Sequence, residues 1–204
     1  MKFIAFDLET TGIVAGIDQI VEIGAIKYNN GEVEAVFSTL VDPRKPIPPA
    51  ASAVNKITND MVAGKPLIET LLEPLTEFCE DAVLVAHNAN FDAQFLLADY
   101  KRFELPTPRG TILDTLAISK KVFPGLANYK LGTLVQHLKI ESGEFHRAEA
   151  DANYAGQLFI ELMKRISVKG SAPGLENLVA LTGKPAFKFP VIEKKARQLE
   201  LFGI

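Results

Sequence analysis

Apolar residues in the first part of the chain follow the spacing of strands. Residues 3–9 are almost all apolar, and residues 19–41 form a run in which apolar and polar residues largely alternate. Both patterns are typical of strands. Asn-Asn-Gly at residues 29–31 divides the second run and predicts a tight hairpin turn. The chain is therefore expected to begin with three strands, the last two joined as a hairpin.

Apolar residues beyond residue 66 recur mostly at intervals of three or four, which predicts helices. Short apolar runs at residues 82–88 and 110–113 interrupt this pattern and are expected to be buried strands. The expected helices cover residues 66–81, where Pro74 should bend or divide the helix, and residues 90–103, 114–123, 130–140 and 148–166. Early strands followed by alternating helices and strands predict an α/β layer fold with a mixed sheet.

The composition changes after residue 166. Residues 167–174, SVKGSAPG, are rich in Gly, Ser and Pro and are typical of a linker. Residues 175–185 predict a short helix, and residues 187–204 show no clear long element. We therefore expect a folded domain over residues 1–167, followed by a linker and tail over residues 168–204.

The length and composition exclude several classes of protein. The 204 residues suit one domain with an appendage, and no apolar run reaches the roughly 20 residues that span a membrane. The first residues lack the long apolar stretch of a secretory signal. The single cysteine, Cys79, has no partner for an internal disulfide, which favours a reducing compartment. A cytoplasmic protein without membrane contact is expected.

The net charge of −3 is unevenly distributed. Residues 1–167 carry 16 Lys and Arg against 22 Asp and Glu, a net charge of −6, and residues 168–204 carry 6 against 3, a net charge of +3. The main domain is thus a poor electrostatic match for a polyanion. If it acts on nucleic acid, it needs metal ions, a local basic groove or a tether.

Acidic residues in three segments stand where a fold alone does not require them. Asp7 and Glu9 end a strand that is otherwise apolar, and the two-residue period of a strand points both carboxylates to one face. Asp92 lies in the first turn of an expected helix, directly after an expected strand. Asp151 follows His146 by five residues, near the start of the last long helix.

Each of these residues, taken alone, has an ordinary structural explanation. The acids fit a solvent-facing turn or the N-terminus of a helix, and the histidine fits a surface loop. Together, four carboxylates that converge at one end of a sheet form a site for hard divalent cations, Mg²⁺ or Mn²⁺ rather than Zn²⁺. Two such ions, about 3.5–4 Å apart, are a known solution for phosphodiester hydrolysis. A histidine can accept the proton of the attacking water.

The three segments resemble, in order, the three motifs of the DEDDh exonucleases, the DnaQ-like branch of the ribonuclease H-like superfamily. Residues 6–12, FDLETTG, match the first motif, residues 87–92, HNANFD, the second, and residues 146–152, HRAEADA, the third. Between them, residues 53–62, AVNKITNDMV, are similar to the family's loop that ends in Ile-Thr. The resemblance covers roughly residues 1–166. It implies a ribonuclease H-like three-layer fold with a mixed central sheet flanked by helices.

The resemblance also implies roles for residues at matching positions. His146 would be the general base. The sister branch carries a tyrosine four residues before its last aspartate, where this chain has Arg147. Two divalent cations, Mg²⁺ or Mn²⁺, would be bound by the four motif carboxylates, Asp7, Glu9, Asp92 and Asp151.

A further set of residues would contact the 3′-terminal nucleotide. One departure from the family is Asn55, which stands where many members carry a histidine. This position lies outside the catalytic set. The residues that the resemblance places against the substrate are Thr10, Thr11, Gly12, Ile57 and Asn88.

The implied reaction is hydrolysis of a 3′-terminal phosphodiester with release of a nucleoside 5′-monophosphate. Contacts near the 2′ position distinguish DNA from RNA, and a sequence does not show them. We expect a DNA 3′-5′ exonuclease in proofreading or repair, acting on single-stranded or frayed 3′ ends. The alternatives are an RNA 3′ exonuclease of the tRNA-trimming or oligoribonuclease type and a docking module without catalytic activity.

The last residues favour DNA. Residues 198–202 resemble the short motif, roughly Gln-Leu-Ser/Asp-Leu-Phe, by which bacterial replication and repair proteins bind the sliding clamp. Only Glu200 departs, and it keeps an acid. A flexible peptide of this kind places apolar side chains in a preformed pocket. A tail folded onto the body, or a dimer contact, is the alternative. The residues expected to bind the clamp are Gln198, Leu199, Leu201 and Phe202.

Tethering to a clamp would raise the effective concentration of an acidic domain on DNA. The combination is similar to the proofreading epsilon subunit of bacterial DNA polymerase III, and equally to a stand-alone repair exonuclease. A replicative polymerase subunit is therefore a further candidate partner.

Overall fold

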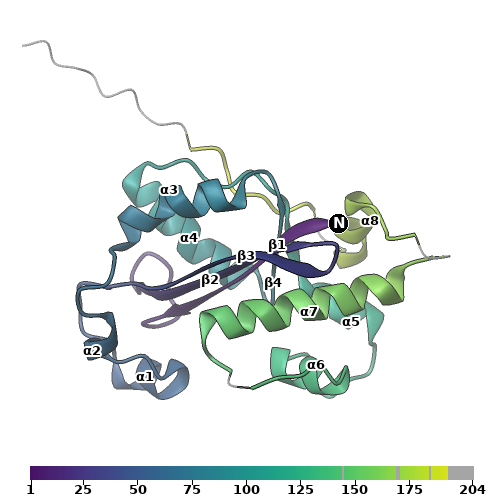
Figure 1. The fold of residues 1–204 in the computed structure, drawn as a ribbon, viewed down its shortest axis with the longest axis horizontal. Coiled ribbons are helices and arrows are strands. Elements are labelled where there is room, and N and C mark those ends of the chain that lie inside the picture. Colours follow the sequence, from purple (N-terminus) through teal and green to yellow (C-terminus); the bar gives the residue numbers. More distant parts are fainter. Residues whose placement is uncertain (144, 169–170, 184, 193–204) are drawn as a thin grey trace, which may run out of the picture.

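The structure of the 204-residue chain is a computed structural model. It describes residues 1–143, 145–168, 171–183 and 185–192. These residues form a layered fold in which helices cover both faces of one sheet (Figure 1). The predicted α/β layer fold with a mixed sheet is confirmed.

The sheet of the described residues has five strands in the order β3-β2-β1-β4-β5. β1 pairs antiparallel with β2, and β2 with β3, whereas the pairs β1–β4 and β4–β5 are parallel. The carboxyl ends of the three parallel strands therefore meet at one edge, which is where ligands bind in sheets of this kind. The strands are β1 (Lys2–Thr10), β2 (Ile20–Asn29), β3 (Glu32–Leu40), β4 (Val83–Ala86) and β5 (Ile112–Asp114).

The predicted hairpin between the second and third strands is confirmed. Asn30 and Gly31 form its turn with φ of 52° and 90°. Two successive positive φ values match the right-handed twist of the flanking strands, and asparagine and glycine adopt them at the lowest cost.

Most helices lie where the apolar periodicity places them. The helix of residues 90–103 has the predicted bounds, and the predicted short helix after residue 174 is present. The helices are α1 (Pro49–Asn55), α2 (Asn59–Val62), α3 (Ile68–Cys79), α4 (Asn90–Phe103), α5 (Thr115–Val122), α6 (Leu131–His137), α7 (Ala148–Ile166) and α8 (Leu175–Thr182).

Two details differ from the sequence-based expectation. Pro74 does not divide its helix, since α3 continues through it to Cys79. Its apolar face, with Leu72 and Leu75, is buried, and this packing outweighs the hydrogen bond that proline cannot make. The short helices α1 and α2 follow the proline-rich loop and were not predicted, because fewer than eight residues carry too little periodicity.

Alternate residues of β1 face opposite layers of the fold. Ile4, Phe6 and Leu8 pack in a core with α3 and α4. Phe3 and Ala5 pack in a second core with α5, α6, α7 and α8. Figure 1 shows α3 and α4 above the sheet, with α5, α6 and α7 below it. Position along β1 therefore decides which layer a side chain meets.

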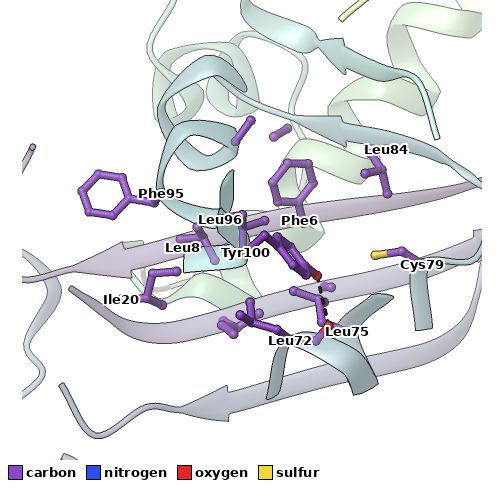
Figure 2. Packing of buried hydrophobic residues seen from close by; sticks show 14 of the residues in the cluster. Phe6, Leu8, Ile20, Leu72, Leu75, Cys79, Leu84, Phe95, Leu96 and Tyr100 are labelled. Carbon is purple, nitrogen blue, oxygen red and sulfur yellow. Dashed lines mark hydrogen bonds between the residues drawn. The ribbon is translucent and has the colours of Figure 1, made fainter. Parts of the chain in front are cut away.

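Figure 2 shows the core on the α3–α4 face. Leu72 and Leu75 from α3 meet Leu96 and Tyr100 from α4 over the sheet residue Phe6. The Tyr100 hydroxyl donates a hydrogen bond to the Leu72 carbonyl oxygen at 3.1 Å, which satisfies the polar end of a buried ring. This core fixes α4 against the strand that carries the first acidic motif.

The described residues after α7 pack against the sheet domain. Leu178 of α8 is fully buried in the core on the α7 face, and Phe189 is buried in the core on the α3–α4 face. Phe187 forms an antiparallel bridge with Ile112, whose N–H donates to the Phe187 carbonyl oxygen at 2.8 Å. The division of the chain at residue 167 stays a prediction. Among the described residues, no helix has the length and apolar character to span a membrane.

Candidate active site

The end of β1 supplies the first two carboxylates. Asp7 and Glu9 continue the face of β1 that carries Phe3 and Ala5, so they face the layer of α7. Both side chains are half-buried. Glu9 lies opposite Glu22 of β2 in the antiparallel register, so a third acid stands on the same face. Like charges at directly opposed positions destabilise a sheet unless other groups compensate.

Asp92 reaches the same end of the sheet from the first turn of α4. β4 ends at Ala86 and pairs with β1 only as far as Ala5, so β1 extends beyond its neighbour. Beyond Ala5, β1 is paired with β2 but no longer with β4. There the N–H of Leu8 donates to Asp92 Oδ1 at 3.1 Å. Asp92 is 3% exposed. The carboxylate thus completes the hydrogen bonding of β1 and lies beside the first motif.

Asp151 comes from the first turns of α7, which lie against β2 at Gly24. Gly24 is paired with Asp7, and a side chain at Gly24 would overlap the backbone of Ala148, the first residue of α7. The missing side chain lets the helix start directly over the sheet. Asp151, one turn further on, is 8% exposed and is held over this face.

His146 lies beside Asp151 and Glu9. Ligand atoms of Glu9, His146 and Asp151 all lie within 4.8 Å of one another. The backbone of His146 has φ of 65°, an unusual value for a residue other than glycine. Its N–H donates to Asp151 Oδ2 at 3.1 Å, while the side chain is exposed. The third motif therefore forms a tight turn that presents a histidine next to carboxylates.

An ion pair between the buried Glu22 and the half-buried Arg147, which the sequence did not reveal, holds this turn. Arg147 Nη2 and Nε donate to the carboxylate of Glu22 at 2.6 to 3.2 Å, and the N–H of Ala148 donates to Glu22 Oε2 at 2.9 Å. Glu22 is 3% exposed. Glu22 thus holds Arg147, the residue after His146. It also accepts an N–H that has no partner within the first turn of α7, where a negative charge is favourable. The only sign of this ion pair in the sequence is Glu22 itself, an acid inside an otherwise apolar strand, because its partner Arg147 lies 125 residues away.

Burial and mutual repulsion raise the pKa values of these acids. Burial, followed by the charges of Asp92 and Asp151, raises the pKa of Asp7 well above its usual range. Burial, then Asp151 and Glu22, raises the pKa of Glu9 to about 7. Burial raises the pKa of Asp92 to about 8, although hydrogen bonds to its carboxylate oppose this. Burial also raises the pKa of Asp151.

These residues fit a divalent cation. Asp151 Oδ1 is buried and has no hydrogen-bond partner among the described residues. An unsatisfied carboxylate oxygen beside other acids is costly unless a positive charge lies nearby. Oxygen donors with one adjacent imidazole match Mg²⁺ or Mn²⁺ better than a thiol-preferring metal.

The residues expected to contact the substrate differ in how far they are exposed. Thr10 ends β1, and Thr11 and Gly12 follow it; Thr10 Oγ1 donates to the Gly12 carbonyl and Thr11 Oγ1 accepts from the N–H of Gln19. Asn88 has φ of 65° and lies at the start of the turn before α4. Ile57 is 0% exposed, so its contact with a substrate stays a prediction that burial does not favour.

Asn55 is a second residue whose importance the sequence did not reveal. It is 2% exposed, its amide donates to the Thr10 carbonyl at 3.4 Å, and its oxygen accepts the N–H of Ile57. A hydrogen bond from Asn55 also lowers the pKa of Glu9. The residue at the family's histidine position thus supports the first motif from α1.

His87 orders the second motif without facing the acids. Its Nδ1 lies 2.9 Å from Thr115 Oγ1 and its Nε2 lies 2.8 Å from the Tyr129 carbonyl oxygen. Burial lowers the pKa of His87. Asp114 caps α5 by accepting the N–H of Leu116.

A groove of about 910 Å³ leads to the cluster. His146 and Asp151 lie at one part of its wall, and the turn of His87 and Asn88, residues of α5, the loop before α6 and α6 itself line other parts. Lys120 and Lys130 also line it. We call it the catalytic groove. The residues predicted to bind a sliding clamp, Gln198, Leu199, Leu201 and Phe202, lie outside the described residues.

Comparison with known proteins decides the family. A family model described as "Exonuclease" matches residues 4–159. The chain belongs to this exonuclease family. The match contains all four motif carboxylates and the histidine, and it ends inside α7.

Two relatives of this exonuclease illustrate its similarity to replication proteins. It is 40% identical over 165 residues to DNA polymerase III subunit epsilon of Treponema pallidum, with 80% of this chain and 77% of the relative covered. It is also 40% identical over 169 residues to a PolC-type DNA polymerase III of Caldanaerobacter subterraneus, with 83% of this chain covered. The chain spans only 12% of that longer polymerase.

Solved structures confirm the ribonuclease H-like fold of the exonuclease. Exonuclease X in complex with 5′ overhanging duplex DNA matches with a TM-score of 0.71 and 29% identity, over 89% of this chain and 99% of that one. Exonuclease I of E. coli in complex with a dA16 oligonucleotide matches with a TM-score of 0.72 at 17% identity, over 81% of this chain and 41% of that one. The second comparison bears on the fold alone.

Proposed function

We propose that this member of the exonuclease family is a DEDDh-type, metal-dependent 3′-5′ exodeoxyribonuclease that releases nucleoside 5′-monophosphates from DNA 3′ ends. One observation carries the proposal: two half-buried carboxylates from β1 and two buried ones from α4 and α7 gather at the carboxyl end of the parallel strands beside an exposed histidine. Burial raises the pKa of each. Such repulsion is tolerable in a site that binds cations.

The four carboxylates of Asp7, Glu9, Asp92 and Asp151 would hold two divalent cations, Mg²⁺ or Mn²⁺. When bound, the cations lower the pKa of a water molecule and stabilise negative charge on the phosphate. The unsatisfied Oδ1 of Asp151 is a free donor atom for this purpose.

His146 would act as the general base. Its exposed ring lies at the wall of the catalytic groove, where a ring nitrogen can take the proton of the attacking water. The water oxygen bonds to the terminal phosphorus, and the bond from phosphorus to the 3′ oxygen of the preceding nucleotide breaks. That 3′ oxygen leaves with a proton, and the terminal nucleoside 5′-monophosphate is released. The hydrogen bond from the His146 N–H to Asp151 holds the base in place.

The relatives support DNA rather than RNA as substrate. One is a subunit of DNA polymerase III, and one structural neighbour was solved with 5′ overhanging duplex DNA, in which the 3′ end is recessed. We propose that Thr10, Thr11, Gly12 and Asn88 line the terminal nucleotide. Proofreading and repair both use this activity.

The tail would recruit the exonuclease to a sliding clamp. The support is the match of residues 198–202 to the clamp-binding pattern, together with relatives that belong to a replicative polymerase. The same relatives favour association with a polymerase subunit.

Degradation of a 5′-labelled single strand and of a 3′-recessed duplex tests the activity. We expect a ladder that shortens from the 3′ end, release of nucleoside 5′-monophosphates by mass spectrometry, and loss of activity in EDTA that Mg²⁺ or Mn²⁺ restores. Asp7→Ala and His146→Ala should each remove the activity while the circular dichroism spectrum is unchanged. Products from the 5′ end, full activity in EDTA, or faster cleavage of the matched RNA would reject the proposal.

A further inference from the structure

A second groove lies next to the catalytic groove and is partly built by residues that follow the family domain. Its volume is about 770 Å³. One wall is formed by β5 and α5, and the other by Val179 and Thr182 of α8 with residues 185–187. The family match ends at residue 159, so this second wall is built by residues that follow the matched segment. We call it the α5–α8 groove.

The two grooves adjoin. Asn88, Leu116 and Lys120 line both of them. Leu116 and Lys120 are one turn apart on α5, so that helix forms the ridge between the grooves. A strand that extends from the catalytic groove past Asn88 would therefore reach the α5–α8 groove next.

The charges of the α5–α8 groove suit a polyanion, although the main domain is acidic. Lys120 and Lys121 line it and are exposed. Asp114 is the one acid among its lining residues described in the structure. Its carboxylate already accepts the N–H groups of Asn88 and Leu116, at 2.9 Å each. The groove therefore offers free positive charge and no free negative charge among these residues.

The remaining lining suits bases. Val179 and Phe187 are half-buried apolar residues of its lining, and the buried Ile112 lies beside them. Asn88 and Asn90 add amide groups that can donate and accept hydrogen bonds. Lysines at a rim above apolar and aromatic side chains are the pattern that binds single strands, with phosphates on the cations and bases on the rings.

We propose that the α5–α8 groove binds the single-stranded DNA that lies on the 5′ side of the terminal nucleotide. This inference rests on the proposed function, because it places the 3′ end in the catalytic groove. The groove holds several nucleotides of the strand through Lys120, Lys121 and the apolar wall. Longer oligonucleotides are therefore bound more tightly than those that fill the catalytic groove alone.

Binding of 5′-fluorescein-labelled dT4 and dT12 by fluorescence anisotropy tests this site. The full chain is used with Asp7→Asn, which prevents cleavage during the measurement, and Mg²⁺ is present. The test variant adds Lys120→Ala and Lys121→Ala. The matched control adds Lys65→Ala and Lys101→Ala, which removes the same charge from exposed residues outside both grooves.

We expect the test variant to lose affinity severalfold for dT12 and much less for dT4. The slope of log affinity against log salt should fall by about 0.7 for each lost phosphate contact. Phe187→Leu, which keeps the backbone bridge and an apolar side chain, should weaken dT12 binding without changing the salt slope. Equal dT12 affinities and slopes in the test and control variants overturn the inference.

Hydrolysis by the chain without Asp7→Asn separates this inference from the proposed function. If dT12 binds through the two lysines but is not hydrolysed, the proposed function fails and the groove remains a single-strand site. If dT12 is hydrolysed and the lysine variant equals its control, the proposed function stands and the inference fails.

Discussion

Glu9 is expected to destabilise the metal-free protein at neutral pH. Its carboxylate is half-buried, faces Asp151 and Glu22, and has a pKa raised from the ordinary 4.5 to about 7, chiefly by burial. In the unfolded chain the same group is ionised above its ordinary pKa. Replacing it with Gln removes the charge and keeps the shape, so Glu9→Gln should stabilise the fold without metal.

The size and the sign of the effect follow from linkage. A shift of about 2.5 pKa units at about 1.4 kcal/mol per unit gives an upper limit of about 3.5 kcal/mol, and partial solvation reduces this to about 1–3 kcal/mol. Between pH 4.5 and 7 the folded state binds more protons than the unfolded state, so the stability of the wild type falls as the pH rises. The advantage of the Gln variant should therefore grow over this range and level off above it.

Urea denaturation in EDTA, followed by circular dichroism at pH 5, 6, 7 and 8, measures this. Glu77→Gln, an exposed acid on α3, is the matched control and should leave the free energy of unfolding unchanged. Mg²⁺ should then stabilise the wild type more than the Glu9→Gln variant. A Gln variant less stable than the wild type at pH 8, or a difference that does not vary with pH, would refute the reasoning.

Four further outcomes are expected. His146→Gln should lower kcat by about 10² to 10⁴ with an unchanged melting temperature, and a smaller loss would argue against its role as base. Glu22→Gln should lower kcat about tenfold with little change in KM, because it weakens the ion pair with Arg147 that holds the His146 turn. An unchanged kcat would contradict this. Gly24→Ala should destabilise the fold by about 1–3 kcal/mol in urea denaturation, since its methyl group overlaps the start of α7. Removing residues 198–204 should abolish stimulation of the nuclease by a sliding clamp and leave hydrolysis without the clamp unchanged. Stimulation that survives this removal would exclude the tail as the docking segment.

The sequence predicted the fold and the acidic cluster because both depend on local patterns. The two-residue period of a strand predicted that Asp7 and Glu9 share one face, and β1 shows the same period in the structure. The hairpin followed from Asn30 and Gly31, whose conformational freedom is a property of the residues themselves. The positions of Asp92 and Asp151 could be predicted because each lies in the first turn of a helix with clear apolar periodicity.

Long-range contacts could not be predicted in the same way. Glu22 was visible as an acid in a buried strand, but nothing local links it to Arg147. Gly24 looks like an ordinary strand glycine until α7 is packed on it. The residues around Asn55 in the sequence suggest an ordinary polar loop position. Only the folded chain brings its amide to Thr10 and Glu9. In each case the role depends on a second segment that the sequence does not position.

The bridge between Ile112 and Phe187 has a practical consequence for protein engineering. A strand at the rim of a sheet presents unpaired N–H and C=O groups that attract other chains. Phe187 covers part of that rim, and it lies beyond residue 159, where the family domain ends by homology. A chain shortened to the homologous segment would keep every acidic residue of the site, yet it would uncover β5 and empty the spaces filled by Leu178 and Phe189. We expect such a fragment to self-associate through the uncovered edge of β5. The segment that carries the catalytic residues is thus shorter than the segment needed for a stable fold.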